Sequence, residues 1–188
     1  AFGGMYQENH QGKQVFPLYL YDLKKKKIIR TLYNHSNTVM AISFSKTGKY
    51  IASTGGNDQE SYVHGTETGK QVQSFAGKGK AVFAAAFGND SSTIYFGTKN
   101  ESQSYKATQP IYKSLSLSNL QAGSFDDVEA ETMPYTRVYT GIKDISLSFS
   151  DGLYNKTLII KTGEKEQSVT LSKDNDTLRT YSLSPDGN

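Results

Sequence analysis

Residues 35–53 carry the strongest structural signal in the chain and read HSNTVMAISFSKTGKYIAS. The apolar residues Val39, Ile42 and Phe44 approach the period-two alternation that is typical of a half-buried β-strand. Residues 145–149 (ISLSF) alternate more strictly, with serine between apolar side chains. No stretch of ten or more residues shows the apolar stripe of an amphipathic helix. The pattern therefore predicts an all-β fold.

The same pattern recurs 43 residues further along the chain. The aligned apolar residues are Val39 with Val82, Phe44 with Phe87, and Ile51 with Ile94. A unit of about 40–45 residues with four short strands is typical of a β-propeller blade, because blades packed around an axis cover the faces that one sheet leaves open. We predict a β-propeller of four-stranded antiparallel blades, with about four blades in this chain. A β-sandwich with evenly spaced strands is the alternative.

The repeat divides this single propeller segment into approximate units. They span residues 1–34, 35–77, 78–126 and 127–174, and residues 175–188 supply the first strand of a further or shared blade. Ala1–Gly4 reads as the end of a second strand, because Ala52–Gly55 occupies that place in the next unit. Two arrangements of the blades at the chain ends follow from this division. Either a closed ring joins both ends of the chain in one shared blade, or the chain is a segment of a longer propeller, which we favour.

Composition narrows the class of protein. The chain has 188 residues, no cysteine and a formal net charge of +3 at pH 7. This charge is too small to predict nucleic-acid binding, and the lack of cysteine excludes a disulfide framework. The longest apolar runs fall far short of the roughly 20 residues that a membrane helix needs, so no contact with a membrane is expected. No secretory signal opens the sequence, which favours the cytoplasm.

Residues 35–53 also resemble a repeat of the WD (tryptophan–aspartate) family. In that family a histidine, here His35, closes the loop before the first strand, and a Phe-Ser-x-x-Gly turn, here residues 44–48, joins the first two strands. Residues 58–70 align with the family's third strand and the turn after it. The chain departs from the family at the Trp-Asp pairs, whose positions read Tyr21-Asp22, His64-Gly65 and Ile160-Lys161.

The resemblance implies a buried structural network within the blades. Its members here would be His35, Ser53, Asp58 and Asp22, with His64 in the tryptophan position. Asp58 lies one residue later than in the family pattern. Because these positions have diverged, we expect the blades to depend on apolar packing more than on the polar network.

The resemblance also implies a non-catalytic scaffold that binds a protein or peptide through loops at one mouth of the propeller. The long insertion Met5–Phe16 and the segment 77–80 are among those loops. The candidate partner-binding residues are Tyr6, His10, Phe16, Lys78 and Lys80. Self-association, or additional chain segments that complete the ring, is a further kind of partner. The alternatives are a propeller enzyme or small-ligand binder that uses the central channel, and a regulatory or sensor segment of a larger multidomain protein.

No catalytic, cofactor-binding or metal site is predicted. The histidines, His10, His35 and His64, lack the spacing of a zinc site. No Ser-His-Asp order, GxSxG elbow or pair of carboxylates points to hydrolysis.

Lys24–Lys27 is the sharpest charge feature of the sequence. Such a run could contact phosphate, an acidic protein or a nuclear import receptor. It fills the turn between a third and a fourth strand, where exposed lysines also protect an outer edge from pairing with another chain. We therefore interpret it as a solvated turn.

Overall fold

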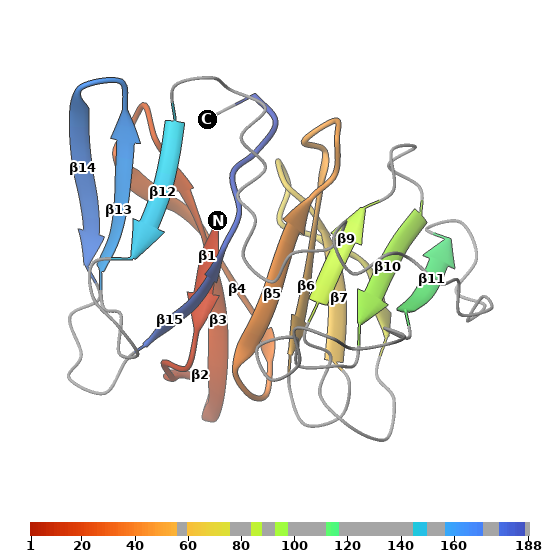
Figure 1. Ribbon diagram of the computed structural model, residues 1–188. Coiled ribbons are helices and arrows are strands. Elements are labelled where there is room, and N and C mark those ends of the chain that lie inside the picture. The colour runs from red at the N-terminus through yellow and green to blue at the C-terminus, as the bar shows by residue number, and fades with distance from the viewer. Residues whose placement is uncertain are drawn as a thin grey trace, which may run out of the picture.

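The computed structural model describes residues 1–55, 60–75, 84–87, 93–97, 112–116, 145–149, 157–170 and 177–186. Every helix or strand assigned in these residues is a β-strand, and the strands pair antiparallel in four sheets (Figure 1). The prediction of an all-β fold is confirmed.

We name each sheet after its first strand in the chain. The β1 sheet has the order β15 (Leu178–Tyr181), β1 (Phe2–Gly4), β3 (Lys13–Asp22) and β4 (Lys27–His35), and β2 (Glu8–His10) pairs with the first residues of β3. The β5 sheet has the order β5 (Val39–Phe44), β6 (Tyr50–Gly55), β7 (Glu60–Gly65) and β8 (Gln71–Phe75). The β9 sheet contains β9 (Ala84–Phe87), β10 (Thr93–Gly97) and β11 (Tyr112–Ser116). The β12 sheet contains β12 (Ile145–Phe149), β13 (Thr157–Thr162) and β14 (Lys165–Thr170).

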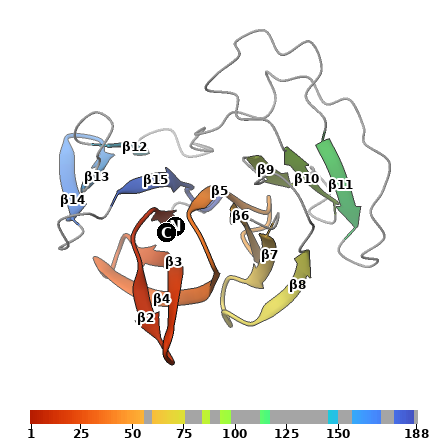
Figure 2. The ribbon, with the colours of Figure 1, turned by 90° about the horizontal axis from the view of Figure 1, so that it is seen from below.

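The four sheets follow one another around an arc, in the order β12, β1, β5 and β9 (Figure 2). Strands β15, β5 and β9 lie on the inner side of this arc, and β14, β8 and β11 lie on its outer side. Contacts between β15 and β5 and between β5 and β9 join neighbouring sheets along the inner side. Each sheet is thus covered by a neighbour, as amphipathic sheets require.

The β1 sheet combines strands from opposite ends of the sequence. Phe2 pairs with Tyr181 on one side and with Tyr19 on the other. β1 therefore lies between β15 and β3, which is the second-strand position that the sequence comparison assigns to Ala1–Gly4.

β3 is buried on both faces because its sheet has a neighbour on each side. Side chains alternate between the two faces of a strand, so Leu18 and Leu20 pack into one cluster and Tyr19 into another. The first cluster joins the β1 and β5 sheets and consists of Phe16, Leu18, Leu20, Leu32, Val39, Ile42 and Ile51. The second joins the β1 and β12 sheets and consists of Phe2, Tyr6, Tyr19, Leu158, Ile160 and Leu178. One strand therefore contributes to the cores on both sides of its sheet.

The expectation of a loop over Met5–Phe16 is wrong, because most of this segment is a β-hairpin. Glu8–His10 pairs with Lys13–Val15 in β3. Gln11 and Gly12 form the turn with positive φ angles of 52° and 78°. A two-residue turn with positive φ at both positions matches the twist of antiparallel strands. This hairpin continues β3 beyond the rest of its sheet.

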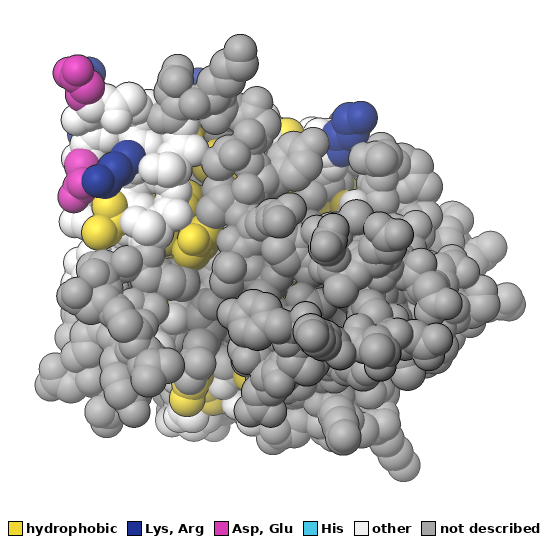
Figure 3. All heavy atoms as spheres, viewed as in Figure 1, with side chains coloured by type: hydrophobic (Ala, Val, Ile, Leu, Met, Phe, Trp, Pro, Cys, Tyr) yellow, Lys and Arg dark blue, Asp and Glu magenta, His cyan; other side chains and the backbone are white. Residues whose placement is uncertain are grey.

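Charges of both signs lie side by side over the β12 sheet (Figure 3). Lys161 Nζ on β13 is 3.3 Å from Glu166 Oε2 on β14, and both side chains are more than half exposed. Such an exposed ion pair adds little stability, but it balances the local charge of this sheet.

Gly55 allows two strands of the β5 sheet to approach closely. It ends β6 opposite Val39, and a Cβ atom at this position would overlap the carbonyl oxygen of Thr38. Backbone atoms cannot move away as a flexible side chain can, so only glycine fits here.

Gly55→Ala is expected to lower the free energy of unfolding by about 1–3 kcal/mol, the range for an added methyl group in a well-packed interior. Urea unfolding followed by circular dichroism measures this change. Ser146→Ala, at an exposed strand position, is the control and should stay within about 0.5 kcal/mol of the parent protein. A parental midpoint for Gly55→Ala would contradict the close approach at Thr38.

Candidate functional site

His35 ends β4 and is buried where the β1 sheet meets the β5 sheet. Its Nε2 forms a hydrogen bond of 2.8 Å with Ser53 Oγ on β6. The ring of Tyr62 on β7 meets the imidazole edge-on, with 4.9 Å between the ring centroids. The structure thus brings together His35 and Ser53, as the resemblance implies, and the bond crosses from one sheet to the next.

Glu60 is a member of this cluster that the sequence reasoning missed. Its Oε2 lies 3.5 Å from His35 Nδ1 and accepts a hydrogen bond of 2.9 Å from the backbone N–H of Ser36. This geometry fits a neutral imidazole with its proton on Nδ1, facing the carboxylate, while the Ser53 hydroxyl donates to Nε2. The available signal was an acidic residue two positions after Asp58, within the segment that aligns with the family's third strand.

His64 on β7 extends the cluster to the outer strands of both sheets. Its Nε2 donates to Asn34 Oδ1 on β4 at 2.8 Å, and Asn34 Nδ2 donates to Gln71 Oε1 on β8 at 3.0 Å. The side chain that stands in the tryptophan position is therefore a buried hydrogen-bond donor. It ties β7, β4 and β8 together.

Burial shifts the ionisation of these groups toward the uncharged imidazoles. Burial lowers the pKa of His64 to about 4, and the nearby His35 acts in the same direction. Burial also lowers the pKa of His35, although Glu60 partly opposes this change. Burial acts to raise the pKa of Glu60, but His35 and the Ser36 side chain and backbone N–H together hold it below its ordinary value. At neutral pH the cluster contains neutral histidines beside one carboxylate.

One predicted member of the network, Asp22, lies elsewhere. Asp22 caps the β3–β4 turn: its Oδ1 accepts from the backbone N–H of Lys25 at 2.8 Å, and Lys25 Nζ is 3.4 Å from its Oδ2. The hydrogen bond from the Lys25 backbone lowers the pKa of the Asp22 carboxyl. Asp58 lies outside the described residues. Among the described residues, the network consists of His35, Ser53, Glu60, His64 and Asn34.

The cluster is closed to a substrate. The side chains of His35 and His64 are only 1% and 2% exposed, so neither imidazole can reach a molecule in solution. In the described part of the chain, no group of three or more His, Cys, Asp or Glu side chains is placed to hold a metal ion. What this arrangement can do chemically is join two sheets through hydrogen bonds.

Two of the predicted partner-binding residues lie inside the protein. Tyr6 is buried, stacks on Tyr19 with 5.3 Å between ring centroids, and donates from its hydroxyl to the carbonyl oxygen of Pro17 at 2.8 Å. Phe16 is buried in the cluster between the β1 and β5 sheets. The expectation of exposed side chains at Tyr6 and Phe16 is wrong, because the hairpin turns both toward the core.

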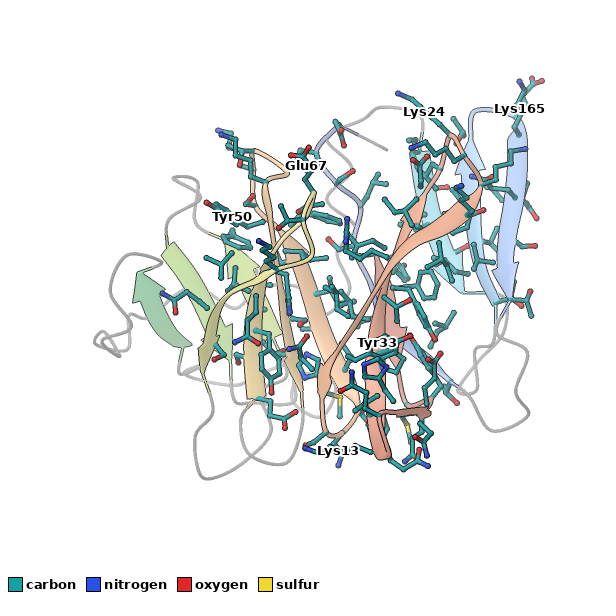
Figure 4. The ribbon with its side chains drawn as sticks, turned by 180° about the vertical axis from the view of Figure 1, so that it is seen from behind. Lys13, Lys24, Tyr33, Tyr50, Glu67 and Lys165 are labelled. Atoms are coloured by element: carbon teal, nitrogen blue, oxygen red, sulfur yellow. The ribbon has the colours of Figure 1, made fainter. Side chains whose placement is uncertain are left out.

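His10 is half-buried on the hairpin. Its ring stacks on that of Tyr33 on β4, with 3.9 Å between centroids and an angle of 9° between planes. Tyr33 and Lys13 lie together at one end of the molecule, opposite Lys24 and Lys165 (Figure 4). We call this end the hairpin surface and define it by Met5, Asn9, His10, Lys13 and Tyr33. Lys78 and Lys80 lie outside the described residues.

Comparison with known families identifies one repeat. The family described as "WD domain, G-beta repeat" matches residues 26–60. This span runs from the β3–β4 turn to Glu60, and it contains His35 and Ser53. This match confirms the predicted WD repeat in this segment of the chain. WD repeats are usually non-catalytic and commonly bind proteins.

No curated protein matches the chain. Within the part of the chain that the structure describes, no helix is long and apolar enough to cross a membrane.

Acid is expected to destabilise the fold through the buried cluster. An unfolded histidine has an ordinary pKa of 6.5, whereas His64 in the fold has a pKa of about 4, so the unfolded chain binds the proton first. The stability due to His64 is complete above about pH 6.5 and is lost as the pH falls toward 4. The pKa of Glu60 is also lower in the fold than its ordinary value of 4.5. Its contribution to stability is therefore also lost as the pH falls below 4.5.

His64→Gln removes one titrating group and keeps a side-chain donor for Asn34. Between pH 6 and pH 4.5, the free energy of unfolding of this variant should fall less steeply than that of the parent, by up to about 1.4 kcal/mol per pH unit for one proton. Urea unfolding at a series of pH values measures the slope. His10→Gln is the control outside the cluster, and an equal loss of slope in that variant would contradict the assignment to His64.

Proposed function

We propose that the protein is a non-catalytic WD-repeat scaffold that binds a protein or peptide partner through the hairpin surface. In this proposal the four sheets are blades of a β-propeller. The order of four strands in both the β1 and β5 sheets supports it, and so does the arc in which the sheets follow one another (Figure 2). The pairing of β15 with β1 supports a shared blade. The units 1–34, 35–77, 78–126, 127–174 and 175–188 remain our proposed division.

The observation that carries the binding role is the ordered hairpin itself. His10 stacked on Tyr33 holds its tip against β4, and a hydrogen bond from the Tyr19 hydroxyl to Glu8 holds its base. A partner that binds this surface therefore orders few additional side chains, which lowers the entropic cost of association.

The exposed side chains suit a protein partner. Met5 is 43% exposed, and Asn9 and Lys13 are exposed beside the stacked rings. Methionine and aromatic side chains are common in interfaces because they combine a large contact area with adaptability or a polar edge. Rigid repeats with functional loops at one end commonly bind in this way.

Site-specific crosslinking tests the proposal. A photo-reactive amino acid replaces Asn9 in one variant and Lys165, at the other end of the molecule (Figure 4), in the control. Irradiation in an extract of the source cells should crosslink a discrete partner from position 9 and not from position 165. The partner is then purified, and its affinity is measured by calorimetry.

The combined variant His10→Ala and Lys13→Glu should weaken that affinity by about tenfold or more, because interface energy concentrates in a few contacts. Lys165→Glu should leave it within twofold. The proposal fails if both positions crosslink the same proteins equally, or if the hairpin variant binds with parental affinity.

A further inference from the structure

The end of the molecule opposite the hairpin collects lysines from the turns of two neighbouring sheets. The β3–β4 turn supplies the exposed run Lys24–Lys27, and the β5–β6 turn supplies the exposed Lys46 and Lys49. Lys24 lies at this end, away from Lys13 and Tyr33 (Figure 4). The solvated-turn interpretation treats each turn separately, but the structure places them on the same end.

Hydrogen bonds connect these turns to one another. Arg30 Nη2 on β4 donates to the carbonyl oxygen of Glu67 in the β7–β8 turn at 2.6 Å. The backbone N–H of Thr66 in the same turn donates to the carbonyl oxygen of Lys49 at 2.9 Å. Gly69, with a φ of 68°, leaves the space that the Arg30 side chain occupies. The lysines of both sheets therefore lie on one connected surface.

Positive charge on this surface exceeds the negative charge that could balance it. Lys25 pairs with Asp22, but none of the described acidic residues forms an ion pair with Lys24, Lys26 or Lys27. The adjacent β12 sheet differs, because there Lys161 pairs with Glu166. Lys24–Lys27, Lys46 and Lys49 place six positive charges at this end, beside the carboxylates of Asp22 and Glu67.

Two exposed isoleucines continue directly from the lysine run. Ile28 and Ile29 are 42% and 46% exposed, and together they are half of the large hydrophobic side chains that are exposed among the described residues. The strand register shifts here, with Leu20 opposite Arg30 and Tyr21 opposite Ile28. Ile29 is therefore the extra residue of a β-bulge, a feature that redirects side chains.

Protection of the outer strand β4 from pairing with another chain explains the lysines and the bulge, but not the exposed isoleucines. Lysines and a bulge at an outer strand both discourage pairing with another chain. Neither role requires two adjacent aliphatic side chains in water. An aliphatic pair beside uncompensated lysines is instead complementary to a ligand with both carboxylates and apolar side chains.

We propose that Lys24, Lys26, Lys27, Ile28 and Ile29 form a docking surface for an acidic segment of a partner protein that also carries apolar side chains. The carboxylates of this segment lie against the lysines, and its apolar side chains cover the two isoleucines. This surface is separate from the hairpin surface, so its test does not depend on the function proposed above.

A nucleic acid fits the same surface less well. Its phosphates would match the lysines, but it offers no aliphatic side chain to cover Ile28 and Ile29. Binding of single strands relies on aromatic side chains and arginine for stacking. Tyr21, which pairs with Ile28, is half-buried against the core, and Arg30 is already bonded to Glu67 and packed against Gly69.

Fluorescence anisotropy with labelled synthetic peptides tests the proposal on the whole chain. One 12-residue peptide contains glutamate, aspartate and leucine, and a second replaces each leucine with serine. The leucine peptide should bind more tightly than the serine peptide. Lys24→Glu combined with Lys27→Glu should weaken its binding about tenfold or more, as expected for close charge pairs.

Ile28→Ser combined with Ile29→Ser should weaken binding of the leucine peptide about three- to tenfold, from the loss of apolar contact area. The same variant should leave binding of the serine peptide unchanged, which attraction by charge alone would not predict. A circular dichroism spectrum like that of the parent shows that this variant retains the fold.

Lys165→Glu is the matched control, because it makes the same charge change on the β12 sheet, and it should stay within twofold of the parent. The proposal is overturned if Lys165→Glu weakens binding as much as Lys24→Glu alone, or if the isoleucine variant binds both peptides like the parent. It is also overturned if an unlabelled 12-nucleotide single strand displaces the leucine peptide at equal or lower concentration than the unlabelled peptide.

Discussion

β3 packs against a neighbouring sheet on each of its two faces, and the rest of the described structure depends on this constraint. Its aliphatic side chains face the β5 sheet and Tyr19 faces the β12 sheet. Residues 15–20 of β3 are all buried, so the strand cannot slip by one residue without exchanging the two sets of side chains between its faces. β3 therefore fixes the register of its own sheet and the spacing of its neighbours.

The polar cluster fixes the alignment of the two sheets, which apolar packing alone does not fix. Apolar contacts tolerate sliding between sheets, whereas the hydrogen bonds between His35 and Ser53 and between His64 and Asn34 each require one alignment of β4 against the β5 sheet. Histidine in the tryptophan position keeps a ring N–H donor and gives up much of the apolar surface. Glu60 lies beside His35 in this cluster, 3.5 Å from its Nδ1.

Much of the β5 sheet could be predicted from the sequence, because its strands alternate clearly and its turns contain glycine. The buried middle of β3, residues 15–20, gave a weaker signal, since a run that is apolar on both faces loses its alternation. Tyr6 and Phe16 were misplaced because aromatic residues in a long connection suit a surface and a core equally well. Glu60 was missed because Asp58 is closer to the family's acidic position. The exposure of Ile28 and Ile29 depends on a bulge, which sequence alone does not reveal.

Native-state hydrogen exchange, followed residue by residue at increasing urea, tests the central role of β3 most directly. Amides that open only when the whole domain unfolds exchange at the global free energy of unfolding. The account predicts that Leu18, Tyr19 and Leu20 belong to this class, and that the exposed strand β14 exchanges earlier through local opening. Exchange of the β3 amides at a lower free energy than those of β13 would contradict it.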